Sequence, residues 1–372
     1  MTTALAPTSS GPQLRSLTSL RVFAALFVLL FHSQLTTVPG LGPLQAVLRI
    51  GYAGVAFFFV LSGFILVWST RADLTRVNFW WRRFARIYPL HIAALLLSVA
   101  LLFRYAPLPW LGQRPSLATV LPTLLLLQAW LPDSDFAFGG NVVSWSLSCE
   151  AFFYAIFPLL MVLARRLGAR QFLQFFIGLF ILTTVIQVAG ALTSVTLDEY
   201  FYTLPLTRLG EFTVGMALGY GFRNAITSRP SLWLVMGSTA LAALAVVVAH
   251  AGPSQSHGFV NPLVTPLFAI VILSAAHGDL AGRRTLLSNR GMVWAGEVSF
   301  AIYLIHLTFI HAVTTIWQST LRWNAASTAA LVVCEIVSVV LFSAALHHGL
   351  ERPINRALRR LVQPPERERS DS

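Results

Sequence analysis

The chain has 372 residues, of which 56% are hydrophobic and only 11% are charged. A soluble domain of this length needs more charged side chains to cover its surface, so these values exclude an ordinary soluble enzyme. The formal net charge is +12, and all 26 basic residues are arginines. In an apolar chain such an excess is typical of the cytoplasmic loops of a membrane protein, so we expect no nucleic-acid partner.

Apolar runs of nearly twenty residues recur along the whole chain, and each is long enough to cross a bilayer as a helix. We therefore predict an all-α, polytopic integral membrane protein with about ten transmembrane helices. The predicted spans are 17–34, 51–70, 88–104, 146–164, 171–192, 204–222, 231–250, 260–277, 293–317 and 325–347.

A further apolar segment, 117–131, is short and contains Pro122. Positive residues concentrate on the cytoplasmic side of membrane proteins. We counted membrane crossings once from each end of the chain, placing the arginine clusters in the cytoplasm. The two counts agree only if segment 117–131 does not cross the membrane completely. We therefore predict a short re-entrant or interfacial helix here, with both termini in the cytoplasm.

No polar block is large enough for a separate soluble domain. We predict a cytoplasmic tail over residues 1–14, one membrane domain over 15–360 and a disordered cytoplasmic tail over 361–372. Both cysteines, Cys149 and Cys334, lie in apolar segments. This placement argues against a disulfide framework and against a metal site.

The first span carries two polar side chains, Arg21 and His32. Ionisable groups inside a bilayer are costly unless they are paired or solvated, so each needs an explanation. The two residues are eleven positions apart, about 16 Å along a helix and close to three full turns. They therefore share one face. A single histidine in a helix can be a packing residue, but the shared face favours a functional role.

Later spans also carry polar residues, including Glu335, a predicted core residue in the last span. The segment Trp145-Ser146-Leu147-Ser148-Cys149-Glu150 enters the membrane and places Glu150 about one turn deep. A carboxylate there can cap the new helix, but a serine suits that role better. Two other sets share a helix face and are either structural or part of a site: the possible ion pair Arg208 and Glu211, and the stripe Ser299, Tyr303 and His306.

Arg83 and Arg86 lie three positions apart, directly before Ile87-Tyr88-Pro89. Two arginines at this spacing form a fork for a phosphate-bearing ligand. The alternatives are ordinary cytoplasmic charge or contacts with lipid headgroups.

These segments together resemble the bacterial acyltransferase 3 family of membrane O-acyltransferases. The resemblance includes an opening Arg-x10-His motif, an Arg-x-x-Arg loop and a Trp-Ser-Leu-x-x-Glu segment. Two departures are Thr18, where an aspartate is usual, and Phe300, where tyrosine is common. The matching blocks, in chain order, are 20–32, 54–64, 83–89, 145–150, 210–212, 299–306 and 351–353.

The resemblance implies an enzyme of the bacterial inner membrane that moves an acyl group, acetyl by default, from acyl-CoA to a hydroxyl. The expected acceptor is a cell-envelope carbohydrate or a glycosylated small molecule, and membrane lipids surround the protein. Acyl-CoA would be a co-substrate, with no permanently bound cofactor. A proton-coupled transporter is the alternative, since it also buries His, Glu and Arg.

We expect Arg83 and Arg86 to bind the CoA phosphates and Arg21 to lie beside the pantetheine arm. His32 is the expected general base, because its unperturbed pKa of about 6.5 suits proton transfer near neutrality. Glu150 is expected to orient His32, as the acid does in a triad. The remaining candidates for oxyanion or substrate contacts are Trp145, Ser146, Arg208, Glu211, Ser299, Tyr303 and His306.

Overall fold

The computed structural model describes residues 13–33, 35, 41–70, 75–104, 115–167, 169–251, 257–318 and 325–361. Nearly all of the two predicted tails, 1–14 and 361–372, lies outside these residues.

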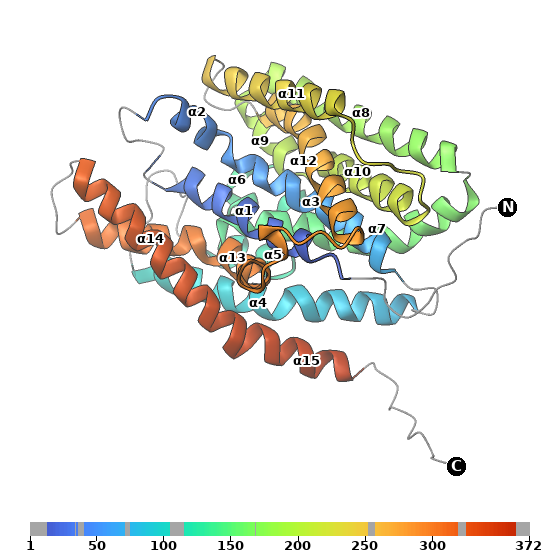
Figure 1. Ribbon diagram of the computed structural model, residues 1–372. Coiled ribbons are helices and arrows are strands. Elements are labelled where there is room, and N and C mark those ends of the chain that lie inside the picture. The colour runs from blue at the N-terminus through green and yellow to red at the C-terminus, as the bar shows by residue number, and fades with distance from the viewer. Residues whose placement is uncertain are drawn as a thin grey trace, which may run out of the picture.

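Ten long helices form the described structure, and each corresponds to one predicted span (Figure 1). They are α1 (Arg15–His32), α3 (Gly54–Ser69), α4 (Arg76–Arg104), α7 (Trp145–Arg166), α8 (Ala169–Thr193), α10 (Pro205–Arg223), α11 (Leu232–Ala251), α12 (His257–Leu280), α13 (Arg290–Gln318) and α14 (Ala325–Leu346).

Nine segments of the described chain are long and apolar enough to cross a membrane. The helix outside this set is α10, which has 19 residues, carries Arg208 and Glu211, and is buried among its neighbours along most of its length. Surrounding helices can shield such charged residues from lipid. The chain is therefore an all-α, multi-pass membrane protein.

The segment predicted to stop short of a full crossing contains the eight-residue helix α5 (Leu117–Leu124). Eight residues rise only about 12 Å, too little to span a bilayer. The chain beyond α5 packs into the bundle, where Ser148 Oγ donates to the carbonyl of Leu126 and Asn141 Nδ2 donates to that of Leu304. This short apolar segment thus supports the start of α7.

The sequence placed Arg83 and Arg86 in a loop before a span starting at residue 88, and that prediction was wrong. The helix α4 begins at Arg76 and continues through Pro89. Residues 83 and 86 therefore lie on a helix, where a spacing of three puts two side chains on one face. The arginine fork is held by regular backbone.

Helices α3 and α10 form the centre of the bundle, and they approach closely because glycines face the partner backbone. A Cβ atom at Gly63 would lie 2.0 Å from the carbonyl oxygen of Phe212, and one at Gly215 would lie 1.9 Å from that of Val60. Small residues at such crossings are typical of membrane helix packing.

The long helices differ in how deeply they are buried. In the α3 span 78% of the residues are buried, but in the α11 span only 11% are, and the apolar side chains of α11 face outward.

At its end, α14 continues through a π-helical turn, His347–Glu351, into α15 (Arg352–Arg360). Figure 1 shows α4 beside α14 and α15 along one side of the bundle. The indole of Trp81 donates to the carbonyl of Leu358 at 2.7 Å, which fixes α15 against α4. π-helical turns often occur at functional sites, and this one places Glu351 next to the arginine fork.

Candidate active site

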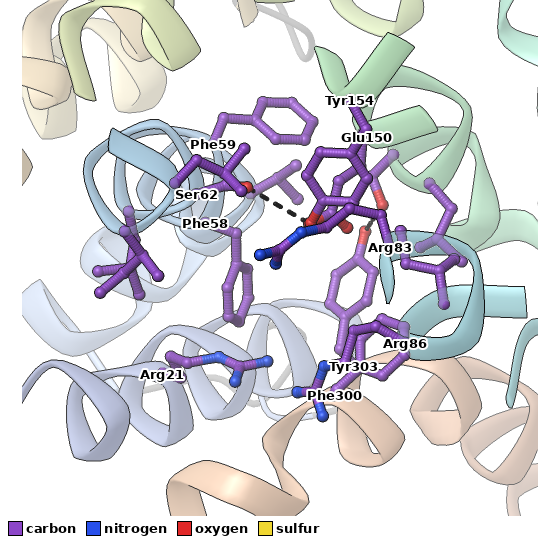
Figure 2. A pocket seen from close by; sticks show the side chains of 17 residues that line it. Arg21, Phe58, Phe59, Ser62, Arg83, Arg86, Glu150, Tyr154, Phe300 and Tyr303 are labelled. Atoms are coloured by element: carbon purple, nitrogen blue, oxygen red, sulfur yellow. Dashed lines mark hydrogen bonds between the residues drawn. The ribbon is translucent and has the colours of Figure 1, made fainter. Parts of the chain in front are cut away.

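A cavity of about 160 Å³ lies between α1, α3, α4, α7 and α13. It is lined by apolar side chains and by a small set of convergent polar groups. Figure 2 shows the guanidinium groups of Arg21, Arg83 and Arg86 entering this one cavity from α1 and α4. The structure thus brings together the three arginines predicted to bind the donor.

Each arginine of the fork is held by neighbours. Arg86 Nη1 lies 2.7 Å from Glu351 Oε1, and its guanidinium lies 5.5 Å from the centre of the Phe300 ring. The Arg83 guanidinium lies 5.5 Å from the ring centre of Phe79 and 5.6 Å from that of Tyr154. The buried Nε of Arg83 has no hydrogen-bond partner in the described structure.

Glu150 also lines the cavity, across from Arg21 and Arg86 in Figure 2. Its Oε1 accepts hydrogen bonds from the hydroxyl of Tyr154 and, at 3.4 Å, from that of Ser62. The structure does not bring Glu150 to His32, so the expected triad-like contact between them is not formed. Three arginines against Glu150 and the bridging Glu351 leave the described cavity with a positive balance that suits an anionic ligand.

His32 contacts His306 instead. His306 Nε2 lies 3.2 Å from His32 Nδ1, and the ring centres are 5.1 Å apart. The helices α1 and α13 approach closely, because Gly296 faces the carbonyl oxygen of Thr18. His306 is completely buried, whereas His32 is partly exposed. Neither histidine lines the cavity.

Backbone carbonyls determine where the imidazole protons lie. His32 Nδ1 lies 2.9 Å from the carbonyl oxygen of Val28, and His306 Nδ1 lies 2.7 Å from that of Tyr303. A carbonyl oxygen can only accept, so we assign a proton to each Nδ1. His306 Nε2 is then an acceptor facing the Nδ1–H of His32, and His32 Nε2 carries a lone pair.

Tyr303 separates the cavity from the histidine pair. Its hydroxyl reaches the cavity and lies 2.7 Å from Ser146 Oγ, while its backbone carbonyl accepts the hydrogen bond from His306. The residues Phe300, Tyr303 and His306 follow one another on α13 over six positions, about 9 Å. These three residues of α13 therefore run from the arginine fork to His32, whereas Ser299 of the predicted stripe does not line the cavity.

The other candidates lie elsewhere. Arg208 and Glu211 form the predicted ion pair, at 3.1 Å, and both are almost completely buried. The Arg208 guanidinium lies over the rings of Phe59, Trp145 and Tyr202. Arg208, Glu211 and Trp145 do not line the cavity, and their arrangement is that of a structural cluster supporting its wall.

Ser299 is completely buried, and its hydroxyl donates to the carbonyl of Gly296 in its own helix at 2.7 Å. Local hydrogen bonds of this kind satisfy a serine within an apolar span. Ser299 therefore has a structural contact of its own and does not line the cavity.

Sequence reasoning missed Glu351, Tyr154 and Ser62 as site residues. Glu351 bridges two groups, since Oε1 binds Arg86 and Oε2 lies 2.8 Å from His347 Nδ1. Its only signal was the block at 351–353, which lies after the last apolar span. Tyr154 follows Glu150 by four positions, the spacing at which two side chains of a helix meet.

Comparison with known proteins shows the family of the chain. The family model described as an acyltransferase domain matches residues 14–348, most of the chain. The Acyltransferase MdmB of Streptomyces mycarofaciens is 33% identical over 366 residues, which cover 94% of this chain and 93% of that protein. No solved structure matches.

Two further relatives carry descriptive names. The exopolysaccharide production protein ExoZ of Rhizobium meliloti is 27% identical over 82% of this chain and 90% of its own length. The peptidoglycan O-acetyltransferase OatA of Listeria monocytogenes is 22% identical over 82% of this chain but only 50% of its own length. The family model and these relatives are those of an enzyme that transfers acyl groups, and they argue against a proton-coupled transporter. The chain belongs to the acyltransferase 3 family of membrane acyltransferases.

Proposed function

We propose that this membrane acyltransferase uses acyl-CoA, with acetyl-CoA as the first donor to test, to acylate a hydroxyl of a carbohydrate or glycosylated small molecule. The observation that carries the proposal is the cavity of three arginines, whose wall residue Tyr303 contacts His306, the partner of His32. The arginine cavity suits an anionic carrier, and the histidine pair suits removal of a hydroxyl proton.

The donor is inferred from the charge of the cavity. Phosphates are bound well by paired guanidinium groups, which donate several parallel hydrogen bonds. Arg83 and Arg86 would bind the phosphates, and Arg21 would lie beside the arm that carries the thioester. The distance from Arg21 to His32 along α1 is about 16 Å. The donor would therefore enter from the arginine-rich end, which we assign to the cytoplasm with both termini.

His32 acts as general base in this proposal. Its Nε2 takes the proton of the acceptor hydroxyl while the hydroxyl oxygen attacks the thioester carbonyl carbon. The Nδ1–H of His32 remains directed to the carbonyl oxygen of Val28 and to Nε2 of His306. The lone pair on His306 Nε2 stabilises the protonated ring of His32. The C–S bond then breaks, its electron pair stays on sulfur, and the thiolate takes the proton from His32. Glu150 holds Tyr154 and Ser62 within the cavity wall.

The acceptor class rests on the relatives. One is named for exopolysaccharide production and another for O-acetylation of peptidoglycan, so carbohydrate hydroxyls recur among them. A partly exposed His32 at the end of α1 far from the arginine fork suits an acceptor arriving from the outer side of the inner membrane.

The test uses purified protein in lipid nanodiscs with acetyl-CoA and a panel of oligosaccharides and glycosides. We expect formation of an O-acetyl ester in equal amount to the free CoA thiol released, with at least one acceptor. A chain that neither binds nor consumes any acyl-CoA in the presence of these acceptors contradicts the proposal.

A further inference from the structure

The cavity wall next to the histidine pair carries two hydroxyl groups whose arrangement suits the charge that forms during acyl transfer. When a hydroxyl attacks a thioester, the carbonyl oxygen becomes negative before the C–S bond breaks. Enzymes stabilise this oxyanion with fixed hydrogen-bond donors, and this is often their largest single contribution to catalysis. The hydrogen-bond donor to the oxyanion must lie between the arginines that bind the CoA phosphates and the general base.

Four hydroxyl groups line the described cavity, and two of them already have an anionic partner. Ser62 and Tyr154 both donate to Glu150 Oε1. The other two, Ser146 and Tyr303, lie 2.7 Å from each other, and each is also within hydrogen-bond distance of the carbonyl oxygen of Val143, at 3.0 and 3.1 Å. This second pair therefore has no anion of its own.

Both protons of this pair already have acceptors, but the phenolic proton of Tyr303 can change its acceptor. Two hydroxyl protons serve one carbonyl oxygen and each other, so a ligand oxygen at Tyr303 can take the phenolic proton while Ser146 donates to the phenolic oxygen. A phenol that accepts one hydrogen bond donates a stronger one, because hydrogen-bonded chains polarise one another. Both residues are at least 95% buried, so bulk solvent has little access to them outside the cavity.

Tyr303 also has the required position. Its ring centre is 5.7 Å from that of Phe58 in the cavity wall and 5.9 Å from that of His306 (Figure 2 shows its side chain entering the cavity). Its backbone carbonyl holds His306, which contacts His32. The phenol thus lies between the arginine fork and the base.

We propose that the Tyr303 hydroxyl, supported by Ser146, donates the hydrogen bond that stabilises the oxyanion of the acyl-CoA thioester during transfer. Tyr303 is then a catalytic residue, and Ser146 is a positioning residue that acts through it. The assignment rests on the proposed acyl-CoA activity. It separates these two hydroxyls from Arg208, Glu211, Ser299 and Trp145, which do not reach the cavity.

The experiment compares Tyr303→Phe and Ser146→Ala with the wild type in nanodiscs. Removing one oxyanion donor costs about 10²-fold to 10³-fold in kcat. We expect Tyr303→Phe to lower kcat about 10²-fold and Ser146→Ala about 10-fold, with the acetyl-CoA dissociation constant within about twofold of wild type. Tyr220→Phe and Ser338→Ala are matched controls on α10 and α14, outside the cavity, and should keep full activity.

A second measurement separates catalysis from structure. A trifluoromethyl ketone analogue of acetyl-CoA, whose carbonyl carbon adds water to form a tetrahedral hydrate, should bind the wild type more tightly than a thioether analogue does, and Tyr303→Phe should remove most of that preference. Full kcat in both variants, or a lowered kcat with the preference retained, overturns the proposal. If the wild type itself does not consume acyl-CoA, the proposed function fails instead. Should Tyr303→Phe not fold, Ser146→Ala decides by the same two readouts.

Discussion

The arginine cavity and the His32–His306 pair are neighbours built in different ways. The cavity holds charged side chains whose partners come from distant segments, as when Glu351 after α14 binds Arg86 of α4. Each histidine is held by a carbonyl of its own helix, and the two rings meet where α1 and α13 touch. The difference suggests that donor binding and proton transfer depend on separate groups, which mutations can separate.

The largest expected effect is on the histidine side. Replacing His32 by alanine removes the general base, and positioned proton transfer contributes about 10²-fold to 10⁴-fold. We expect turnover with acetyl-CoA to fall about 10³-fold while the donor dissociation constant changes little. Steady-state kinetics and equilibrium binding measure the two quantities. The exposed His250 on α11 provides a control, and His250→Ala should behave as wild type.

The double change Arg83→Ala with Arg86→Ala should act on the other side of the comparison. Hydrogen bonds to charged groups contribute about 1.5–3 kcal/mol each, so losing two predicts a donor dissociation constant at least about 10²-fold higher. The charge-matched control is Arg166→Ala with Arg170→Ala, at exposed positions outside the cavity. Equal weakening in both double variants would indicate a general charge effect and no built phosphate site.

Glu351→Gln should also weaken donor binding, but by less than the double arginine change. The change removes the charge that bridges Arg86 and His347 but keeps the side-chain shape. Arg86 then loses its fixed position, and we expect KM for acetyl-CoA to rise several-fold with kcat nearly unchanged. If kcat falls and KM stays constant, Glu351 acts on the chemical step and the separation of the two regions fails.

The smallest effect concerns stability, away from both regions. In α9 (Val195–Thr203), Asp198 accepts hydrogen bonds from the backbone of His257 and Gly258 and from the His257 ring. Burial raises the pKa of Asp198, but these hydrogen bonds outweigh burial and hold the pKa below its usual value.

The contribution of Asp198 to stability is therefore complete above the unfolded-state pKa of about 3.9 and is lost as the pH falls through the lower folded-state value. Asp198→Asn should lower stability at pH 7 by about 1 kcal/mol. It should also weaken the loss of stability between pH 5 and pH 3, followed by thermal melting in nanodiscs. Asp133→Asn, at an exposed position, is the control; an equal change there would contradict the assignment.

Much of the fold follows from the sequence because the bilayer restricts what an apolar chain can do. Runs of nearly twenty apolar residues gave all ten long helices, and the ion pair of Arg208 with Glu211 followed from spacing within one helix. The start of α4 was wrong because Arg82, Arg83 and Pro89 lower the hydropathy of residues that are nevertheless helical.

The candidate site was predicted by residue but not by contact. Polar residues inside apolar spans identified Arg21, His32, Glu150, Tyr303 and His306. Partners across helices depend on how far one helix is shifted along another, which is set by close contacts such as that of Gly296 with Thr18. For this reason His32 was expected to meet Glu150, and the structure places it against His306 instead.

The central claim is that one donor molecule spans both regions, with its phosphates at the arginines and its thioester near the histidines. The most direct test is photocrosslinking of the wild type with a CoA thioester that carries a diazirine in its acyl chain, followed by peptide mass spectrometry. The account predicts labels on the α13 peptide containing Tyr303 and His306 or on the α1 peptide containing His32, and excess unlabelled acetyl-CoA should compete them away. Labels confined to the outward-facing helix α11, or labels that acetyl-CoA does not displace, would contradict it.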